Sequence, residues 1–583
     1  MDKVRSPVFA RRASRRALLA QASRVGAASL LSPVALPAAA REARSRPPAE
    51  LRGRTIDLVV SEAPVNLTGR TRPATLINGS LPAPTLRWTE GETVRIRVTN
   101  RLSEPTSIHW HGLILPFEMD GVPGISFPGI APGETFTYRF RIQQAGTYWY
   151  HSHSAFQEQT GMYGAIVIDP PSGPSGLREH VVVLSDWTDL SPAGVYKRLK
   201  TDSGLYNFIR PTTPQLIAEA ARDGVAAALT RREMWNRMRM SPTDLSDLSS
   251  AVLTYLCNGL PPEANWTGTF APGERVRLRF VNAAANTFYD VRVPDLPLTV
   301  VQTDGVDVEP VTVDEFRFGP GETYDVIVEP RRDAYTIFAQ AMDRTGFARG
   351  TLAAAPGLAA PVPAVDPPRW LTMADMVGAA GMSGMSGMSG MGTASGEHAH
   401  EMPPPAEATP VRARHAASEY GPSTDNRVDV PRVALDDPGP GLRDNGRRVL
   451  TLADLHSRTP LPDERDPGRE IELHLTGNME RYAWSFDGLE FGRSTPVHFR
   501  HGERLRVVLH NDTMMTHPMH LHGMWSDVET PAGEAAFRRH TVPVQPGQRV
   551  AFRVTADALG RWAWHCHLLF HMDAGMFREV VVS

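Results

Sequence analysis

A short repeated pattern limits the folds that this chain can adopt. Residues 91–100, 273–282 and 502–511 each begin with Gly-Glu, carry apolar side chains at alternate positions and end with asparagine. Side chains alternate between the two faces of a β-strand, so this period-two pattern predicts a strand with one face in a hydrophobic core. Three copies, far apart in the sequence, predict three related β domains.

A second repeated unit occurs near both ends of the chain. The Pro-Gly pair at 132–133 precedes His151 by the same number of residues as the pair at 546–547 precedes His565. Apolar residues alternate between the two points in both copies, which predicts a duplicated strand–turn–strand unit. The Pro-Gly pairs in the middle of the chain are followed by no histidine pair.

These repeats predict an all-β fold of three β-sandwich domains, at residues 51–172, 173–350 and 441–583. Residues 190–250 are richer in helix formers, and we expect them to insert one or two short helices into the second domain. Residues 351–440 are rich in Pro, Ala, Gly and Ser, which is typical of a linker. The metal ligands discussed below fall in the first and third domains.

Composition excludes several classes of protein. The 50 prolines and 48 glycines favour turn-rich β structure over helical bundles. No uninterrupted apolar run of about 18 residues is present, so we expect no membrane span. Cys257 and Cys566 are the two cysteines, and no disulfide framework constrains the fold. We expect Cys257 to be a small buried hydrophobe.

Residues 1–40 resemble a twin-arginine export signal, with an ordinary Sec signal as the alternative. Arg11-Arg12 precedes an Ala-rich, weakly apolar stretch, and the segment ends in Ala38-Ala39-Ala40, a small-residue cleavage pattern. We therefore expect export to the periplasm. Removing seven Lys/Arg and one Asp changes the net charge from −3 to −9, which argues against nucleic acid as a partner.

The last part of the chain carries a set of soft and borderline metal ligands. His565-Cys566-His567 is followed by His571 and Met576. One thiolate, two imidazoles and a weak axial thioether make a blue-copper electron-transfer site, and Cys566, His571 and Met576 supply three of these ligands. His565 and His567 point to the opposite face of an extended strand, so we expect them to bind a second metal centre.

Histidines gather in four blocks that contain ten of the chain's twenty. In a His-x-His strand both rings lie on one face, so each pair can serve neighbouring ions. A single pair is weak evidence for metal, whereas four blocks confined to the outer domains are strong evidence. The blocks are His109-Trp-His111, His151-Ser-His153, His517-Pro-Met-His520-Leu-His522 and His565-Cys566-His567 with His571.

With these blocks in this order, the chain resembles a three-domain multicopper oxidase, and more closely the periplasmic copper-resistance oxidases of the CopA/PcoA type. The resemblance implies three cupredoxin-like Greek-key domains and four copper ions, three of them in a cluster between the first and third domains. It implies a type 1 copper held by His517, Cys566, His571 and Met576, a type 2 copper held by His109 and His520, and a type 3 pair held by His111, His151, His153, His522, His565 and His567.

Reduction of O2 also needs protons, and the resemblance suggests one source. Asp120 lies nine residues after His111 and matches an acid that relatives place near the cluster, so we propose it as a proton donor or relay. A turn aspartate before Gly121 is the alternative. Many relatives have an acid directly after the second type 1 histidine, but this chain has Met572 there and Asp573 next. The second proton path is therefore in doubt.

The linker suggests the substrate. Seven of the chain's 21 methionines lie in thirty residues, and Gly-Met-Ser is repeated there at a spacing of three; they are Met373, Met376, Met382, Met385, Met388, Met391 and Met402. Thioethers favour Cu(I), and a Gly/Ser backbone lets several sulfurs surround one ion, so we expect additional Cu(I) there. The alternative is a low-complexity linker whose methionines bind nothing.

We therefore expect a copper-dependent oxidase that takes electrons from Cu(I), and also from phenols, and reduces O2 to water. The resemblance places this activity in copper tolerance in the bacterial periplasm, with periplasmic copper-handling proteins as partners. One alternative is a laccase-type phenol oxidase. The other is a copper-sequestering protein with no enzymatic activity, although storage alone would not require a complete ligand set for a trinuclear cluster.

Overall fold

The computed structural model of the protein describes residues 48–206, 213–238, 245–369, 371, 375, 378 and 412–583. The predicted export signal at residues 1–40 and the methionine-rich run from Met373 to Met402 lie outside the described residues. In the part of the chain that is described, no helix has the length and apolar character needed to cross a membrane.

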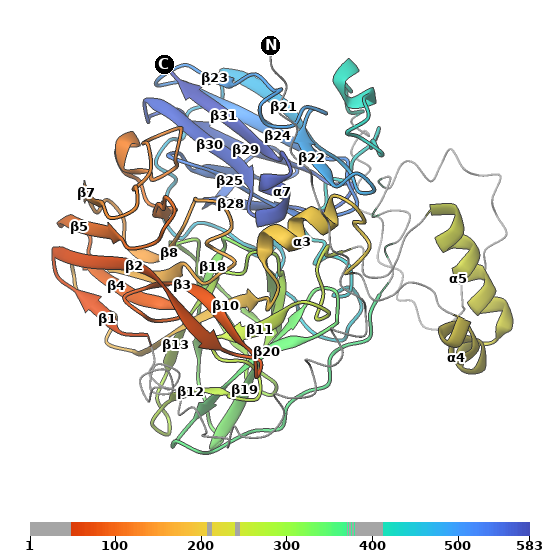
Figure 1. The fold of residues 1–583 in the computed structure, drawn as a ribbon, viewed down its shortest axis with the longest axis horizontal. Coiled ribbons are helices and arrows are strands. Elements are labelled where there is room, and N and C mark those ends of the chain that lie inside the picture. The colour runs from red at the N-terminus through yellow and green to blue at the C-terminus, as the bar shows by residue number, and fades with distance from the viewer. Residues whose placement is uncertain are drawn as a thin grey trace, which may run out of the picture. The chain divides into compact units, whose positions relative to one another are not determined.

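Strands dominate the described chain and form six sheets, two for each third of the sequence (Figure 1). The first third forms sheets in the orders β1-β4-β9-β8-β6 and β3-β2-β5-β7. Their strands are β1 (Glu50–Arg52), β2 (Thr55–Asn66), β3 (Thr71–Ile77), β4 (Ala83–Thr89), β5 (Thr93–Asn100), β6 (His109–His111), β7 (Thr135–Arg141), β8 (Gly146–His151) and β9 (Tyr163–Asp169).

The middle third forms sheets in the orders β11-β10-β13-β18-β15-β16 and β12-β20-β19-β14-β17. Their strands are β10 (Arg178–Trp187), β11 (Thr254–Cys257), β12 (Trp266–Thr269), β13 (Val276–Asn282), β14 (Tyr289–Arg292), β15 (Leu298–Thr303), β16 (Val306–Val313), β17 (Glu315–Phe318), β18 (Thr323–Val328), β19 (Ala334–Ala341) and β20 (Phe347–Ala353).

The last third forms sheets in the orders β22-β21-β24-β29-β26-β27 and β23-β31-β30-β25-β28. Their strands are β21 (Arg469–Asn478), β22 (Ala483–Phe486), β23 (Val497–Phe499), β24 (Arg504–Asn511), β25 (His517–Leu521), β26 (Ser526–Glu529), β27 (Ala535–Arg539), β28 (Thr541–Val544), β29 (Arg549–Thr555), β30 (Gly560–Cys566) and β31 (Phe577–Val582). The predicted all-β class is confirmed.

The three repeated segments form the equivalent strands β5, β13 and β24. In β5, Val94, Ile96 and Val98 are fully buried, and they alternate with residues that face outward. Each of the three strands pairs in parallel with one neighbour and antiparallel with the other. The period-two pattern therefore marks a central strand whose inner face builds the hydrophobic core of its sandwich.

The asparagine that ends each repeat has the same structural role in all three domains. Asn100, Asn282 and Asn511 are completely buried. Each side-chain amide donates two hydrogen bonds to backbone carbonyls, and each side-chain oxygen accepts one from the backbone N–H two residues later. These bonds satisfy the backbone of the loop that leaves the strand, and in the third domain this loop leads to the His517 block.

The predicted helical insertion is present in the second domain, but it holds three helices within the described residues where one or two were expected. They are α3 (Pro192–Leu199), α4 (Thr213–Asp223) and α5 (Val225–Met238). Ser191 caps α3 by accepting a hydrogen bond from Gly194 N, and Pro192 occupies its first turn. Shorter helices are η1 (Phe117–Met119), η3 (Ala417–Tyr420), η4 (Leu452–Asp454) and α7 (Leu569–Asp573).

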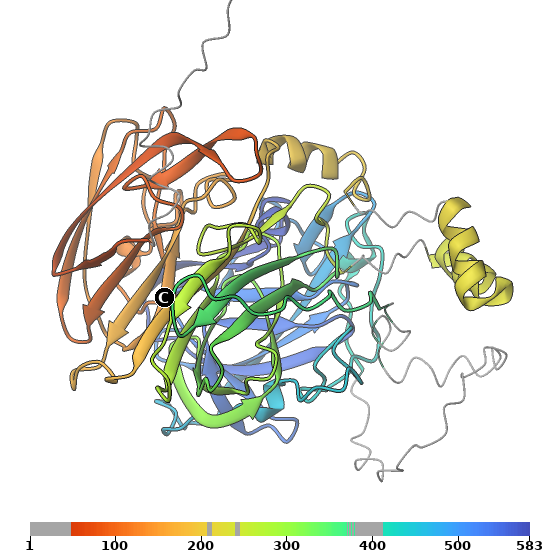
Figure 2. The same cartoon turned by 90° about the horizontal axis from the view of Figure 1, so that it is seen from below.

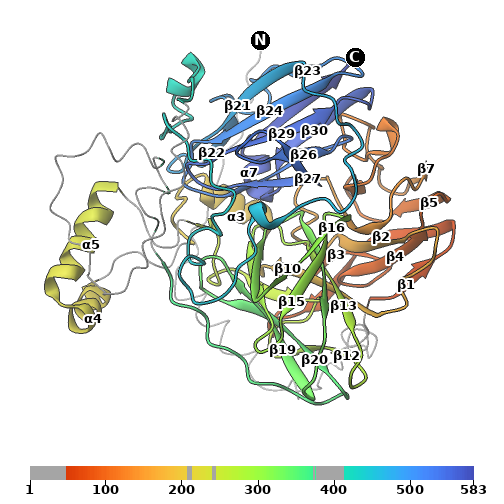
Figure 3. The same ribbon diagram turned by 180° about the vertical axis from the view of Figure 1, so that it is seen from behind.

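Figure 2 shows the strands of the three domains, coloured red to orange, green and blue, packed beside one another, and buried polar contacts join them. Thr323 Oγ1 of β18 donates to the carbonyl of Thr147 in β8 at 2.9 Å. Arg539 of β27 forms an ion pair with Asp304 at 3.0 Å, and both side chains are fully buried. Figure 3 shows β27 beside β16, at the junction of the second and third domains. The middle domain is thus bonded to both domains that carry the histidine blocks.

Candidate metal centres

Two paired strands of the first domain carry its histidine blocks. His109 and His111 are the two ends of β6, His151 ends β8, and His153 follows two residues later. The strands are antiparallel, with His109 opposite His151. The ring of His109 lies 5.5 Å, between centroids, from the rings of both His151 and His153. Alternate residues share one face of a strand, so this pairing gathers four imidazoles on one side of the sheet.

Strands β25 and β30 of the third domain carry the other blocks. They pair antiparallel, with His520 opposite His565 and Met519 opposite Cys566. Successive residues of a strand point to opposite faces, so His565 faces the first-domain histidines while Cys566 faces the interior of its own domain. The first-domain and third-domain histidines meet across the domain boundary.

Overlapping groups of three histidines form at that boundary, among them His109 with His520 and His522, and two of the groups together hold six different histidines. In each group the ring nitrogens lie within 4.8 Å of one another. His565 Nε2 lies 3.0 Å from His522 Nε2 and 3.3 Å from His153 Nε2. These two groups are His111, His151 and His567, and His153, His522 and His565.

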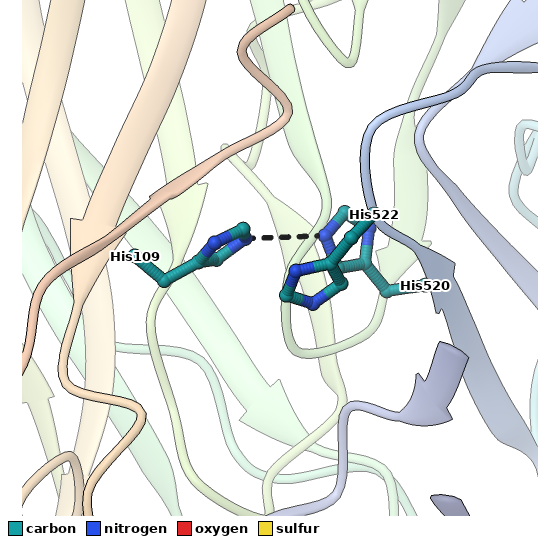
Figure 4. A group of neighbouring side chains, drawn as sticks. All are labelled: His109, His520 and His522. Carbon is teal, nitrogen blue, oxygen red and sulfur yellow. Dashed lines mark hydrogen bonds between the residues drawn. The ribbon is translucent and has the colours of Figure 1, made fainter. Parts of the chain in front are cut away.

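His109 and His520 face each other beside these groups (Figure 4). His109 Nδ1 donates to the carbonyl of Asp120 at 2.8 Å, and His520 Nδ1 donates to the carbonyl of His540 at 2.7 Å. A carbonyl only accepts hydrogen bonds, so each ring carries its proton on Nδ1 and presents a lone pair at Nε2. The two Nε2 atoms are 3.4 Å apart. Two facing lone pairs at this distance suit a shared cation.

Cys566 lies in a separate, fully buried group with His517 and His571. Its Sγ is 3.5 Å from His517 Nδ1 and 3.9 Å from His571 Nδ1. His571 Nε2 donates to Asp247 Oδ2 at 2.6 Å, which leaves the Nδ1 lone pair directed at the group. Met576 is also fully buried, and its carbonyl accepts from Cys566 N at 3.1 Å. The ring of Trp484 stacks on His571 at 3.9 Å.

Burial keeps these groups uncharged in the absence of metal. It raises the pKa of the Cys566 thiol, and it lowers the pKa of His565 to about 4. Burial also lowers the pKa well below the usual imidazole range in His111, His151, His153, His517, His520, His522 and His567. Neutral imidazoles and a thiol that needs a nearby cation to ionise form a donor set that fits copper.

Asp120 lies against the histidine cluster. Its Oδ2 accepts from His522 Nδ1 at 2.9 Å, while its carbonyl accepts from His109. Asp573, in contrast, is solvent-exposed on α7, and Met572 packs beside Val122 and Phe577. The residues that follow His571 therefore bring no carboxylate to the cluster.

Three further residues touch the predicted ligands although sequence reasoning did not identify them. Glu158 Oε2 lies 2.7 Å from His151 Nδ1, and Asp247 bonds His571. His540 groups with His111 and His520, and burial lowers its pKa to about 4. Glu158 lies in a loop and Asp247 in the helical insertion, where no spacing pattern identifies them. His540 is an isolated histidine, which by itself is a weak signal.

Three multicopper oxidase models match residues 59–173, 178–356 and 464–583. Copper resistance protein A of Escherichia coli is 52% identical, and the match covers 92% of this chain and 93% of that protein. Copper resistance protein A homolog of Pseudomonas syringae pv. tomato has the same identity and coverage.

Solved structures share the fold at lower identity. The crystal structure of Fet3p, a multicopper oxidase that functions in iron import, aligns with a TM-score of 0.63 and 20% identity, covering 91% of both chains. At this identity the likeness shows the fold alone, and it agrees with the predicted cupredoxin-like architecture. The family models and the 52% identity establish more than the fold. This chain belongs to the multicopper oxidases, a family of copper-dependent oxidoreductases, and within it to the copper resistance protein A group.

Proposed function

We propose that this protein is a periplasmic multicopper oxidase of copper tolerance that takes electrons from Cu(I), and also from phenols, and reduces O2 to water. One observation carries the proposal. Strand β30 joins a buried Cys566 group to an eight-histidine cluster through adjacent residues, His565-Cys566-His567. A protein that only stored copper would not need this connection.

The proposed ligand sets follow the geometric groups. A type 1 copper would be held by His517, Cys566, His571 and Met576, a type 2 copper by His109 and His520, and a type 3 pair by His111, His151 and His567 on one ion and His153, His522 and His565 on the other. When bound, these four coppers supply single-electron acceptance at the mononuclear site and a place for O2 reduction at the cluster.

The surrounding residues orient the ligands and hold protons. Asp247 fixes the tautomer and ring plane of His571, as carboxylates beside metal-bound histidines do. Asp120 fixes His522 through its carboxylate and His109 through its carbonyl. Because this carboxylate is buried against the cluster, we assign it the role of proton donor or relay.

The proposed substrate and location rest on two segments of the sequence, the linker before the third domain and the N-terminal forty residues. The methionine-rich run from Met373 to Met402 supplies soft ligands suited to Cu(I). Residues 1–40 carry the twin-arginine pattern, which supports export to the periplasm in a folded state. Periplasmic copper-handling proteins would then be the partners that exchange copper with this chain.

The test is O2 consumption by the copper-loaded, full-length protein with Cu(I) as donor. Cys566→Ser should abolish turnover, while Cys257→Ala, at a buried cysteine far from the histidine blocks in sequence, should retain it. Replacing the seven linker methionines with serine should weaken turnover with Cu(I) and leave turnover with a phenol unchanged. Turnover with phenols alone would identify a laccase, and tight copper binding without O2 uptake would identify a sequestering protein.

A further inference from the structure

A second group of buried histidines lies in the third domain, outside the proposed copper centres. His474 of β21 and His510 of β24 are opposite each other on paired strands, and their rings stack 4.7 Å apart at 11°. The ring of His415, from the segment before η3, lies 4.9 Å from that of His474. The three side chains are 5%, 3% and 1% exposed for His415, His474 and His510 respectively.

Carboxylates set the orientation of two of these rings. His474 Nδ1 donates to Asp512 Oδ2 at 2.7 Å, and His415 Nδ1 lies 2.7 Å from Glu419 Oε2. Both carboxylates are buried. With the proton on Nδ1, the neutral ring has a lone pair at Nε2, and neither Nε2 has a hydrogen-bond partner, although Asp429 Oδ1 lies 3.4 Å from His415 Nε2. This is the arrangement that carboxylates impose on metal-binding histidines. Burial lowers the pKa of His474, but the Asp512 and Glu419 carboxylates outweigh it and raise that pKa, so a cation bound at Nε2 would displace a proton.

Glu472 brings an oxygen to the same place. Its Oε1 lies 2.8 Å from His510 Nε2 and 3.9 Å from His474 Nε2. The contact with His510 is not aligned as a hydrogen bond, and both ring nitrogens of His510 remain unpartnered. Burial is the main reason that the pKa of His510 is lowered to about 2, and repulsion from charge on His474 and Arg549 lowers it further. The ring of His510 is therefore neutral. Glu472 is 33% exposed, which gives the group access to solvent.

The proposed type 2 pair shows the same features. In that pair Nδ1 is occupied by an acceptor, as it is in His415 and His474, and the two Nε2 atoms face each other 3.4 Å apart. A buried polar group left unsatisfied costs about 1–3 kcal/mol. Two such nitrogens beside one carboxylate oxygen, those of His474 and His510 beside Glu472, are therefore suited to a bound ion.

We propose that Glu472, His474 and His510 bind one divalent cation of the Zn(II)/Cu(II) class. Two imidazole nitrogens and one carboxylate oxygen suit such borderline ions, with water from the exposed side as a fourth ligand, and the absence of sulfur among these donors disfavours Cu(I). The site does not depend on the proposed oxidase activity.

The first test measures the metal content of the full-length protein. The protein is loaded with copper, then with Zn(II), and unbound metal is removed by gel filtration before analysis. The summed content of copper and zinc should be about one ion per chain greater in the wild type than in the double variant His474→Gln/His510→Gln. The control His498→Gln, at an exposed histidine of β23, should match the wild type. All variants share the linker, so its copper cancels. Equal metal content in all three proteins would overturn the proposal.

A second test covers the case in which the double variant does not fold. Glu472→Gln alters a partly exposed ligand, and Asp512→Asn alters the residue that orients His474 through Oδ2 while an oxygen stays available to accept from Val428 N. Competition with a chelator should show Zn(II) affinity at this site weakened by about 10–100-fold in Asp512→Asn. Type 1 absorption should be unchanged in both, which separates this site from the copper centres. Unchanged Zn(II) affinity in both variants would refute the site.

Discussion

The second and third domains share one architecture but differ in what the corresponding strands carry. Their six-stranded sheets have the same strand order, as do their five-stranded sheets. In the third domain, β25 and β30 place His520 opposite His565. In the second, the corresponding strands β14 and β19 place Asp290 opposite Gln340.

In the second domain, arginines of the same domain form ion pairs with the buried carboxylate of Asp290. Asp290 is fully buried and accepts two hydrogen bonds from Arg317, at 2.6 and 2.9 Å, and Arg344 lies 2.6 Å away. After burial, which acts the other way, the two guanidinium groups lower the pKa of Asp290. The same scaffold thus holds an ion-pair network in one domain and a proposed metal cluster in the other. The fold provides paired strands, and side chains at their ends decide the chemistry.

The largest expected effect is on O2 turnover, and it distinguishes Asp120, beside the histidine cluster, from Asp290, in the ion-pair network of the second domain. Asp120→Asn should keep a hydrogen-bond acceptor for His522 but lose the proton, so O2 turnover should fall by about 10²–10⁴-fold with copper content retained. Turnover per copper-loaded molecule should stay near the wild-type value in Asp290→Asn. Stopped-flow O2 kinetics measure both. Equal turnover in the two variants would contradict the role assigned to Asp120.

Asp290→Asn should instead reduce stability. It leaves two buried guanidinium groups without their carboxylate, which costs about 3–5 kcal/mol. A lower Tm with unchanged copper per folded molecule, followed by calorimetry and metal analysis, is the expected result. Glu309→Gln, at an exposed position of β16, is the matched control and should leave Tm unchanged. Copper loss in Asp290→Asn at a temperature where the protein is folded would contradict the comparison.

The metal-free protein should lose stability as pH falls from about 6.5 to about 4. Burial lowers the folded pKa of His540 and His565 to about 4, below the usual value of about 6.5 in an unfolded chain. The unfolded chain therefore binds more protons in this window, and protonation favours unfolding. A pH series of Tm should be shallower for His540→Asn than for the wild type. Parallel pH profiles would show that this ring does not titrate on unfolding.

The smallest effect tests what the two domains have in common. Asn282→Ala and Asn511→Ala each remove a buried side chain that donates two hydrogen bonds and accepts one from a backbone N–H, and Asn511 also accepts one from Thr513 Oγ1. Each should lower the free energy of unfolding by about 1–3 kcal/mol. Chemical denaturation of the metal-free protein measures both. Similar losses are expected, and a loss in one domain alone would mean that the repeat does not have the same role in both.

Much of the fold was predictable from local patterns. The alternation around Val94, Ile96 and Val98 predicted a half-buried strand because strand geometry is a local property. The count of helices in the insertion was wrong, since α3 to α5 lack a long apolar stripe that would show their boundaries. The copper types and their ligands remain predictions, although the predicted histidines do lie together in the groups described above.

The amino-acid order alone specifies three β domains, the strands that end in histidines, and the opposite facing of Cys566 and His565. These follow from a two-residue period and need no knowledge of distant contacts. Which histidines share an ion, and which carboxylates orient them, depends on contacts between residues far apart in the chain. His571 with Asp247 and His474 with Asp512 are joined only when separate segments pack. Local periodicity cannot determine such pairs, because hydrogen bonds between segments are set by the packing of whole domains.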